Sequence, residues 1–274
     1  MSPAPTLSLL GGTSVPQVAL GTWPMGDEEV ERACLTAFEA GYRHVDTAEN
    51  YENEVGVGRA VRASGLPREE LFVTTKINRQ WHAAPADGLA GNLRRLGLEH
   101  VDLLLLHWPN PAQDLYVRAW EGLVELRERG LARAVGVSNF KPAHLDRVIA
   151  ATGVTPEVNQ VELHPFLTRD AVRAYHAEHG IVTEGWSPLG RDNGLLDHPV
   201  VVATGAAHDV TPAQVLLRWQ TQQGYVVAPN SADPRRQAQN LDVFGFDLSG
   251  DELEALHALD TGEAHAVDSD TFGH

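Results

Sequence analysis

Short apolar runs alternate along the chain with segments in which hydrophobic residues recur at helical spacing. The apolar runs predict eight β-strands, at Val18–Leu20, His44–Asp46, Phe72–Thr75, Val101–Leu106, Ala134–Val137, Val158–Glu162, Val182–Trp186 and Val226–Ala228. The fourth run, VDLLLL, has no polar alternation, which is typical of a parallel strand that is buried on both faces. Strands that alternate with helical segments predict βαβ units. The pattern therefore predicts an α/β fold, a (β/α)8 TIM barrel.

Two segments illustrate the predicted helices. Asp27 is expected to cap the first helix and Gly41 to end it. Between them, one helical face carries the apolar side chains Val30, Ala33, Cys34, Ala37 and Phe38. A second helix is predicted over residues 115–130, with an apolar face that includes Val117, Trp120 and Val124.

The two ends of the chain have a different character. The segment LSLLGGTSVPQVAL predicts a β-hairpin that turns at Gly11 and Gly12 and plugs the bottom of the barrel, and we assign residues 1–17 to this cap. Residues 261–274 are polar and aperiodic, so we expect a tail that lies over one rim. No low-complexity linker divides the chain, and residues 1–274 are expected to form a single barrel domain.

Composition narrows the classes of partner. The formal net charge of −16 argues against nucleic acid, because phosphate binding needs clustered Lys and Arg. Cys34 is the only cysteine, which excludes an internal disulfide, and no apolar run approaches the roughly 20 residues that a membrane span needs. The N-terminal sequence lacks the features of a signal peptide. We expect a cytoplasmic monomer that binds neither nucleic acid nor membrane.

Four chemically different side chains stand at or just beyond the ends of predicted strands: Asp46, Tyr51, Lys76 and His107. The C-terminal ends of barrel strands meet at one rim, so these groups are expected to lie together. A free Tyr has a pKa of about 10, and a neighbouring ammonium lowers this pKa by favouring the phenolate. We expect Lys76 to act on Tyr51 in this way, while Asp46 keeps Lys76 charged. His107 is then placed to orient the oxygen that receives a proton.

A second polar set falls on the next strands. Ser138 and Asn139 follow the fifth strand, and Gln160 lies in the sixth. Their hydroxyl and amide groups suit the carboxamide of a nicotinamide ring, although Ser138 and Asn139 would also cap a helix that begins near Lys141. Trp186, at the end of the seventh strand, offers a flat surface for such a ring, or else packs in the core.

The segment VVAPNSADPRRQAQN follows the eighth strand. It places Ser231, Arg235, Arg236 and Asn240 around a helix that is predicted to begin at Pro234. A helix N-terminus beside Arg side chains makes an anion site that suits a cofactor phosphate. A solvated arginine pair on a surface helix is the alternative.

Three other motifs carry weaker signals. The segment GVGRAV lacks the third glycine and does not follow a strand, so it does not support a Rossmann fingerprint. His176 and His179 lack the HExxH spacing and His164 has no obvious metal partners, so no metal site is expected. VGVSNF is not the GxSxG elbow of a hydrolase.

The segments GYRHVDTAENYENE, FVTTKI, LLLLHWPNP, VGVSNF, VNQVELHP and GWSPLG, in this order and spacing, resemble the aldo-keto reductase family. The resemblance covers nearly the whole chain, and the chain is most similar to bacterial enzymes of the diketogluconate reductase subgroup. It implies that Tyr51 is the general acid, that Lys76 lowers its pKa, and that Asp46 supports Lys76. It implies that His107 orients the carbonyl.

The resemblance also implies how ligands are bound. The expected cofactor-binding residues are Gly21, Thr22, Ser138, Asn139, Gln160, Trp186, Ser187, Leu189, Asn230, Ser231, Arg236, Gln239 and Asn240. The expected substrate pocket contains Trp23, Asn78 and Trp108.

Two departures from the family pattern affect these expectations. Asn230 stands where relatives that prefer NADPH carry a lysine for the 2′-phosphate, and Gln239 replaces a Glu. Loss of one charge-assisted contact costs on the order of 1.5 to 3 kcal/mol. The resemblance implies NADPH as the cofactor, and the lost contact leaves NADH as an alternative. Asn78 stands where many relatives carry Trp, with Trp81 displaced, which alters one pocket wall.

Together these observations predict an enzyme that reduces the carbonyl of small aldehydes, ketones, dicarbonyls or keto sugar acids by hydride transfer. A non-catalytic nicotinamide-binding barrel, acting as a sensor or interaction module, is the alternative. Metal-dependent hydrolysis on a barrel would need converging His and Asp ligands, and Lys76 and Tyr51 occupy the positions where those ligands would stand.

Overall fold

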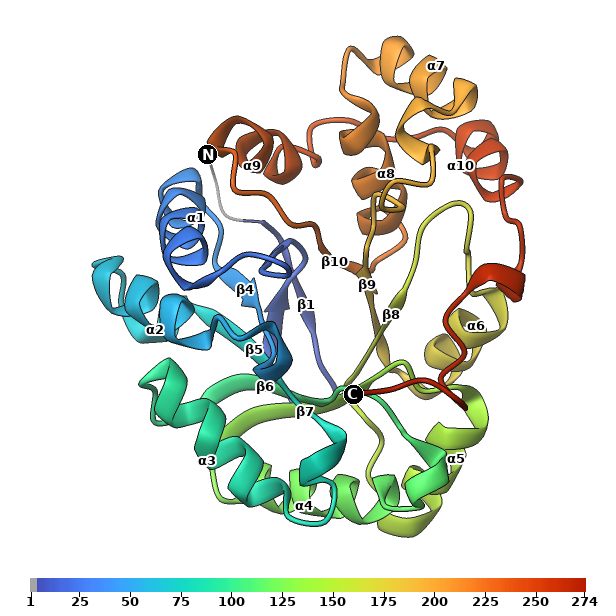
Figure 1. The fold of residues 1–274 in the computed structure, drawn as a ribbon. Helices are drawn as coiled ribbons and strands as arrows, with labels where there is room; N and C mark the ends of the chain where they lie inside the picture. Colours follow the sequence, from blue (N-terminus) through green and yellow to red (C-terminus); the bar gives the residue numbers. More distant parts are fainter. Residues whose placement is uncertain (1–3) are drawn as a thin grey trace.

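The computed structural model describes residues 4–274 and confirms the α/β barrel (Figure 1). Residues 1–3 of the predicted cap lie outside the described residues. Within residues 4–274, eight parallel strands neighbour one another in chain order: β3 (Ala19–Gly21), β4 (His44–Asp46), β5 (Phe72–Ile77), β6 (Val101–Leu106), β7 (Ala132–Ser138), β8 (Val158–Glu162), β9 (Val182–Trp186) and β10 (Val226–Ala228). The first strand is shifted by one residue from its predicted position, and β5 and β7 are longer than predicted. Backbone pairing with the neighbouring strands, and not apolarity alone, decides where a strand ends.

The sheet closes on itself between β3 and β10. The backbone N–H of Gly21 donates to Pro229 O at 3.0 Å, and the N–H of Val227 donates to Gln17 O at 2.9 Å. A Cβ at position 21 would lie 2.7 Å from Ala228 O. Glycine at this position therefore allows the first and last strands to approach closely enough to close the barrel.

Helices surround the strands (Figure 1). In the described residues they are α1 (Asp27–Ala40), α2 (Glu54–Ala63), α3 (Pro85–Leu96), α4 (Tyr116–Glu128), α5 (Pro142–Thr152), α6 (Asp170–His179), α7 (Pro199–His208), α8 (Pro212–Thr221), α9 (Pro234–Leu241) and α10 (Gly250–His257). No single helix in residues 4–274 is long and apolar enough to cross a membrane. The bent pair α7 and α8 meets that length and composition only when its two helices are joined.

One helix prediction needs correction. Asp27 does not cap α1 but is its first residue, because its carboxylate accepts the backbone N–H of Gly56 at 2.7 Å and so ties α1 to α2. The C-terminal stop at Gly41 is confirmed, since this residue has φ 113° in the left-handed region. In α4, Val117 and Val124 lie at the edge of the core, and the fully buried face is Tyr116, Ala119, Trp120, Leu123 and Leu126.

The N-terminal hairpin closes the bottom of the barrel, as predicted. It pairs β1 (Thr6–Ser8) with β2 (Ser14–Pro16) in antiparallel register. Its Leu9 and Val15 pack against barrel side chains that include Phe72 and Leu103. The backbone N–H of Gly11 in the turn donates to the Glu157 carboxylate at 2.8 Å.

Side chains along each strand alternate between the helices and the barrel interior. On β5, Val73 and Ile77 join the core between barrel and helices, which leaves Thr74 and Lys76 on the interior side. The interior is apolar near the hairpin and becomes polar toward the C-terminal ends of the strands. The polar side chains at this end of the barrel include Asp46 and Lys76.

Candidate active site

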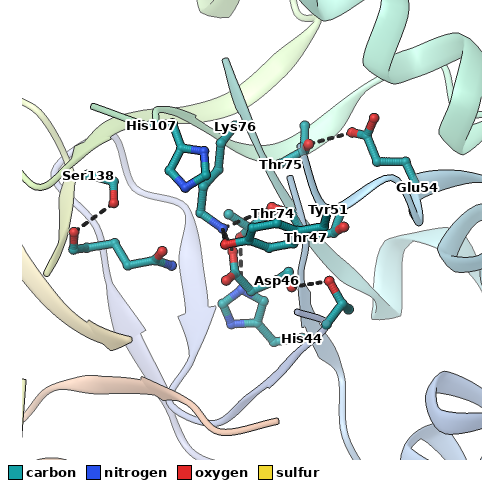
Figure 2. Close-up of polar contacts among 12 residues, drawn as sticks. His44, Asp46, Thr47, Tyr51, Glu54, Thr74, Thr75, Lys76, His107 and Ser138 are labelled. Carbon is teal, nitrogen blue, oxygen red and sulfur yellow. Dashed lines mark hydrogen bonds and ion pairs between the residues drawn. The ribbon is translucent and has the colours of Figure 1, made fainter. Parts of the chain in front are cut away.

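A buried ion pair lies at the centre of the polar end of the barrel (Figure 2). Lys76 Nζ donates to Asp46 Oδ1 at 2.7 Å and to Thr47 O at 3.0 Å, and its side chain is 0% exposed. Burial is the largest single effect and would lower the pKa of Lys76, but the Asp46 carboxylate together with the acidic groups of Tyr51 and Glu184 outweighs burial, so this pKa is raised above its ordinary value. Lys76 therefore stays charged although no solvent reaches it.

Tyr51 presents its hydroxyl to this ion pair. It ends the 3-10 turn η1 (Glu49–Tyr51), and Lys76 Nζ lies 3.4 Å from its hydroxyl oxygen and 5.0 Å from its ring centroid. Burial raises the pKa of Tyr51, and the attraction of Lys76 offsets only part of this effect. The expected net lowering of the pKa is therefore wrong, because the cost of removing a phenolate from water exceeds the stabilisation that one cation provides.

The turn that carries Tyr51 is held from outside the barrel. The Glu49 carboxylate accepts the indole N–H of Trp81 at 2.9 Å, and Arg95 lies 3.6 Å from the same carboxylate. The displaced Trp81 thus anchors the turn. Sequence reasoning missed this contact, because Glu49 and Trp81 meet only after β4 and β5 pair.

His107 follows β6 and faces Tyr51, with ring centroids 5.9 Å apart. Burial and the Lys76 cation hold the pKa of His107 well below its ordinary value, so the imidazole is neutral at neutral pH. Its Nδ1 lies 3.0 Å from Asn78 Oδ1. Asn78 is not among the residues that line the cavity at this rim, and its side chain contacts the His107 imidazole, so its predicted place in the substrate pocket wall stays a prediction.

A cavity of about 770 Å³ opens at the C-terminal ends of the strands, within the range of about 300 to 1,000 Å³ that small-molecule sites occupy. It gathers most of the residues that the sequence singled out: Gly21, Thr22, Trp23, Asp46, Tyr51, His107, Trp108, Ser138, Asn139, Gln160, Trp186, Ser187, Leu189 and Asn230. Lys76 lies behind the cavity wall and acts through Asp46 and Tyr51. Nearly all these residues follow or end strands, which is why they share one rim.

The remaining predicted residues lie outside this cavity. They follow β10 or belong to α9: Ser231, Arg236, Gln239 and Asn240. The predicted helix start at Pro234 is confirmed, but its N-terminus is already capped, because the Asp233 carboxylate accepts the backbone N–H of Arg235 at 2.8 Å. The helix end is therefore a weaker anion site than the sequence indicated.

Several lining residues were missed: Asn50, Pro188, Arg191, Asp192, Ala228, Pro229, Val267, Phe272 and His274. Most of these residues lie in the same loops as predicted residues, so their position in a loop that follows a strand could have indicated that they line the cavity. The tail residues carried no such signal. The ring of Phe272 lies 4.9 Å from that of Trp108, and the ring of His274 lies 5.5 Å from that of His107.

Two salt bridges and a backbone hydrogen bond also connect the tail to the barrel. Lys141 Nζ lies 2.6 Å from Asp268 Oδ1 and 2.5 Å from Asp270 Oδ2, and the backbone N–H of Arg79 donates to His274 O at 2.7 Å. The tail therefore forms part of the cavity wall.

The amide groups on the opposite wall differ in how fully they are satisfied. Ser138 Oγ donates to Gln160 O at 2.8 Å, and Asn139 Oδ1 accepts the indole N–H of Trp186 at 2.9 Å. Ser138 therefore does not cap a helix, and α5 begins later, after Lys141. Gln160 Nε2 is buried and makes no hydrogen bond of good geometry within residues 4–274, although the Gln160 amide lies near enough to the Glu184 carboxylate to lower the pKa of that group. A buried unpaired donor facing a cavity fits a ligand carbonyl such as that of a carboxamide.

Glu184 on β9 is a further buried carboxyl group that sequence reasoning missed. It is 0% exposed, and neither carboxylate oxygen makes a hydrogen bond of good geometry in the described residues, with the Gln160 side chain as the neighbouring donor. Burial, reinforced by the charge of Asp46, raises the pKa of Glu184 to about 8. Below that pH it is a neutral acid inside the barrel. Among residues 4–274, no group of three or more His, Cys, Asp or Glu is arranged to hold a metal ion.

Comparison with known proteins agrees with this geometry. Residues 10–261 match the Aldo/keto reductase family. The chain is 48% identical to 2,5-diketo-D-gluconic acid reductase B of Corynebacterium sp., over 97% of both chains. It is 44% identical to methylglyoxal reductase DkgA of Escherichia coli, over 97% of this chain and 98% of that one.

Solved structures show the same likeness. A mutant of Gox0644 in complex with NADPH superposes with a TM-score of 0.94 and 39% identity, over 98% of each chain. The chain therefore belongs to the aldo/keto reductase family. It is an oxidoreductase that acts on carbonyl groups.

Proposed function

We propose that this enzyme reduces small dicarbonyls, aldehydes, ketones and keto sugar acids to alcohols, with NADPH as cofactor and Tyr51 as the general acid. The observation that carries the proposal is that Tyr51, His107 and Asp46 face one cavity, with Lys76 directly behind. The names of the diketogluconate and methylglyoxal reductases support this substrate class. The bound NADPH of Gox0644 supports the cofactor.

The roles of the chain's own residues follow from their contacts. The nicotinamide, when bound, supplies a hydride to the carbonyl carbon. The Tyr51 O–H bond breaks as the carbonyl oxygen takes the proton, and the Lys76 ammonium stabilises the phenolate that remains. Asp46 holds Lys76 charged and in place. The neutral His107 imidazole orients the oxygen.

Binding of the cofactor is assigned to the opposite wall and the adjacent loops. Gln160 Nε2, the unpaired donor, is suited to the carboxamide oxygen, and Trp186 is suited to stacking on the ring. Arg236 is the cation assigned to the 2′-phosphate, since Asn230 supplies no charge. We therefore expect NADPH to be preferred by a narrow margin over NADH.

We infer further that the enzyme is a cytoplasmic monomer whose residues 1–274 form one domain, and that it binds neither nucleic acid nor membrane. The excess of acidic residues supports the exclusion of nucleic acid. Size-exclusion chromatography with light scattering tests the oligomeric state.

The test of the proposed function compares wild type with Tyr51→Phe. The variant should bind NADPH with unchanged affinity, measured by fluorescence, and should lose at least about a hundredfold in kcat with methylglyoxal, because the proton donor is gone. Full turnover by the variant would contradict the role of Tyr51. If wild type binds NADPH but oxidises none of it with any aldehyde, dicarbonyl or keto sugar acid, the non-catalytic alternative is correct.

A further inference from the structure

Within the part of the chain that the structure describes, the Asn78 side chain is linked to the active site through the His107 imidazole. Asn78 Oδ1 lies 3.0 Å from His107 Nδ1, and the two residues are 3% and 6% exposed. His107 lines the cavity and Asn78 does not. The Asn78 side chain makes no other hydrogen bond within residues 4–274, so its amide is free to present either end to the ring.

The backbone holds these two residues side by side. Ile77 at the end of β5 pairs with Leu106 at the end of β6. The residues that follow them, Asn78 and His107, are therefore neighbours. The N–H of His107 donates to Ile77 O at 3.0 Å, and the N–H of Trp81 donates to Asn78 O at 3.0 Å. The contact therefore belongs to the sheet and to the turn that follows it.

A neutral imidazole carries one proton, on either Nδ1 or Nε2, and the partner of one nitrogen decides which. If the amide oxygen faces Nδ1, the proton sits on Nδ1 and Nε2 is a bare acceptor. If the amide NH₂ faces Nδ1, then Nδ1 accepts and Nε2–H is a donor. A half turn of the amide exchanges the two arrangements.

We propose that Asn78 is a positioning residue that sets the tautomer of His107, a role that rests on the proposed carbonyl reduction. A carbonyl oxygen has only lone pairs, so it needs the Nε2–H donor that the NH₂ orientation creates. The alcohol product has a proton to donate, and the oxygen orientation leaves Nε2 free to accept it. One amide thus supports His107 with both substrate and product, without a change of charge.

The groups around His107 keep it neutral while this happens. Tyr51 faces it from η1, the Lys76 cation from β5 with its partner Asp46 on β4, and His274 from the tail. Both Lys76 and His274 oppose its protonation. The wild-type rate should therefore show no titration of His107 near neutral pH.

Two variants of Asn78 distinguish an effect on the tautomer of His107 from an effect on the charge of His107. Asn78→Leu keeps the branched shape of the side chain without its hydrogen bonds, and it should lower kcat for methylglyoxal about tenfold while leaving NADPH affinity unchanged. Asn78→Asp supplies a pure acceptor that favours imidazolium and raises the His107 pKa. Its kcat/KM should increase as the pH falls through that raised pKa, because imidazolium restores Nε2–H. A wild-type pH profile in Asn78→Asp would contradict the proposal.

A double-mutant cycle and nuclear magnetic resonance complete the test. On a His107→Gln background, Asn78→Leu should cause no further loss; a full additional loss would overturn the proposal. The ring ¹⁵N shifts of His107, assigned by subtraction of His107→Gln, should change between wild type and Asn78→Leu. Unchanged shifts would also overturn it. This spectroscopic result does not depend on turnover. Failure of the tautomer proposal can therefore be distinguished from failure of the proposed function, which the Tyr51→Phe variant tests.

Discussion

Lys76 donates to Asp46 at 2.7 Å in the interior of the barrel, where the Lys76 side chain has no exposed surface. Such a pair offsets the cost of burying two charges only while both partners are present. Its position also links the stability of the barrel to the chemistry at Tyr51, because Lys76 Nζ contacts the Tyr51 hydroxyl as well.

Removal of the cation should destabilise the protein. We expect Lys76→Met to lower the free energy of unfolding by about 3 to 5 kcal/mol, because the Asp46 carboxylate is then buried without a partner. Urea denaturation measures this change. The double variant Lys76→Met with Asp46→Leu should recover part of the loss, and a double variant less stable than Lys76→Met would show that the pair is not the cause.

Glu184 should make the stability depend on pH. Its pKa is raised from 4.5 to about 8 by burial, so the folded protein binds a proton that the unfolded chain releases. The contribution of Glu184 to the free energy of unfolding is therefore most favourable below pH 4.5 and falls as the pH rises toward about 8. Unfolding of wild type and Glu184→Gln in urea, compared across this range, isolates the effect. The stability of Glu184→Gln relative to wild type should increase with pH; a constant difference would argue against a neutral Glu184.

Asn230→Lys should strengthen the preference for NADPH. Asn230 is exposed and its amide donates to Trp23 O at 2.6 Å, so a lysine here has room to reach a phosphate. One new charge-assisted contact should increase NADPH affinity by about tenfold or more. NADH affinity should stay constant, because NADH lacks the 2′-phosphate. Fluorescence titration of both cofactors gives the ratio, with Asn230→Gln as a neutral control.

The C-terminal tail should affect substrate binding mainly through the aromatic contact between Phe272 and Trp108. Phe272→Ala removes a ring 4.9 Å from that of Trp108, and we expect KM for the carbonyl substrate to rise several-fold with little change in NADPH affinity. The Lys141 salt bridges are exposed, and such pairs contribute about 0 to 1 kcal/mol. Lys141→Gln should therefore change KM less than Phe272→Ala does. Steady-state kinetics of the two variants decides whether packing or charge holds the tail.

Much of the site was predictable from the chain. Asp46, Lys76 and His107 end or follow apolar runs, and the loop position of Tyr51 follows from the same pattern. The predicted direction of the Tyr51 pKa was wrong, because the cost of burial depends on the surrounding atoms and not on one neighbour. The contact between Asn78 and His107 was not predictable for a similar reason. Its place beside His107 depends on the register between two strands.

The amino-acid sequence by itself determined the barrel and the rim on which its polar strand ends meet. This follows because parallel strands connected by helices place all their C-terminal ends at one edge, whatever the details of packing. Only the tertiary structure decided that Asn78 contacts His107, that the Glu184 carboxyl group is buried inside the barrel, and that Phe272 reaches Trp108. These contacts join residues from different strands or from an aperiodic tail. Their geometry depends on strand register and barrel closure, which no local pattern of residues encodes.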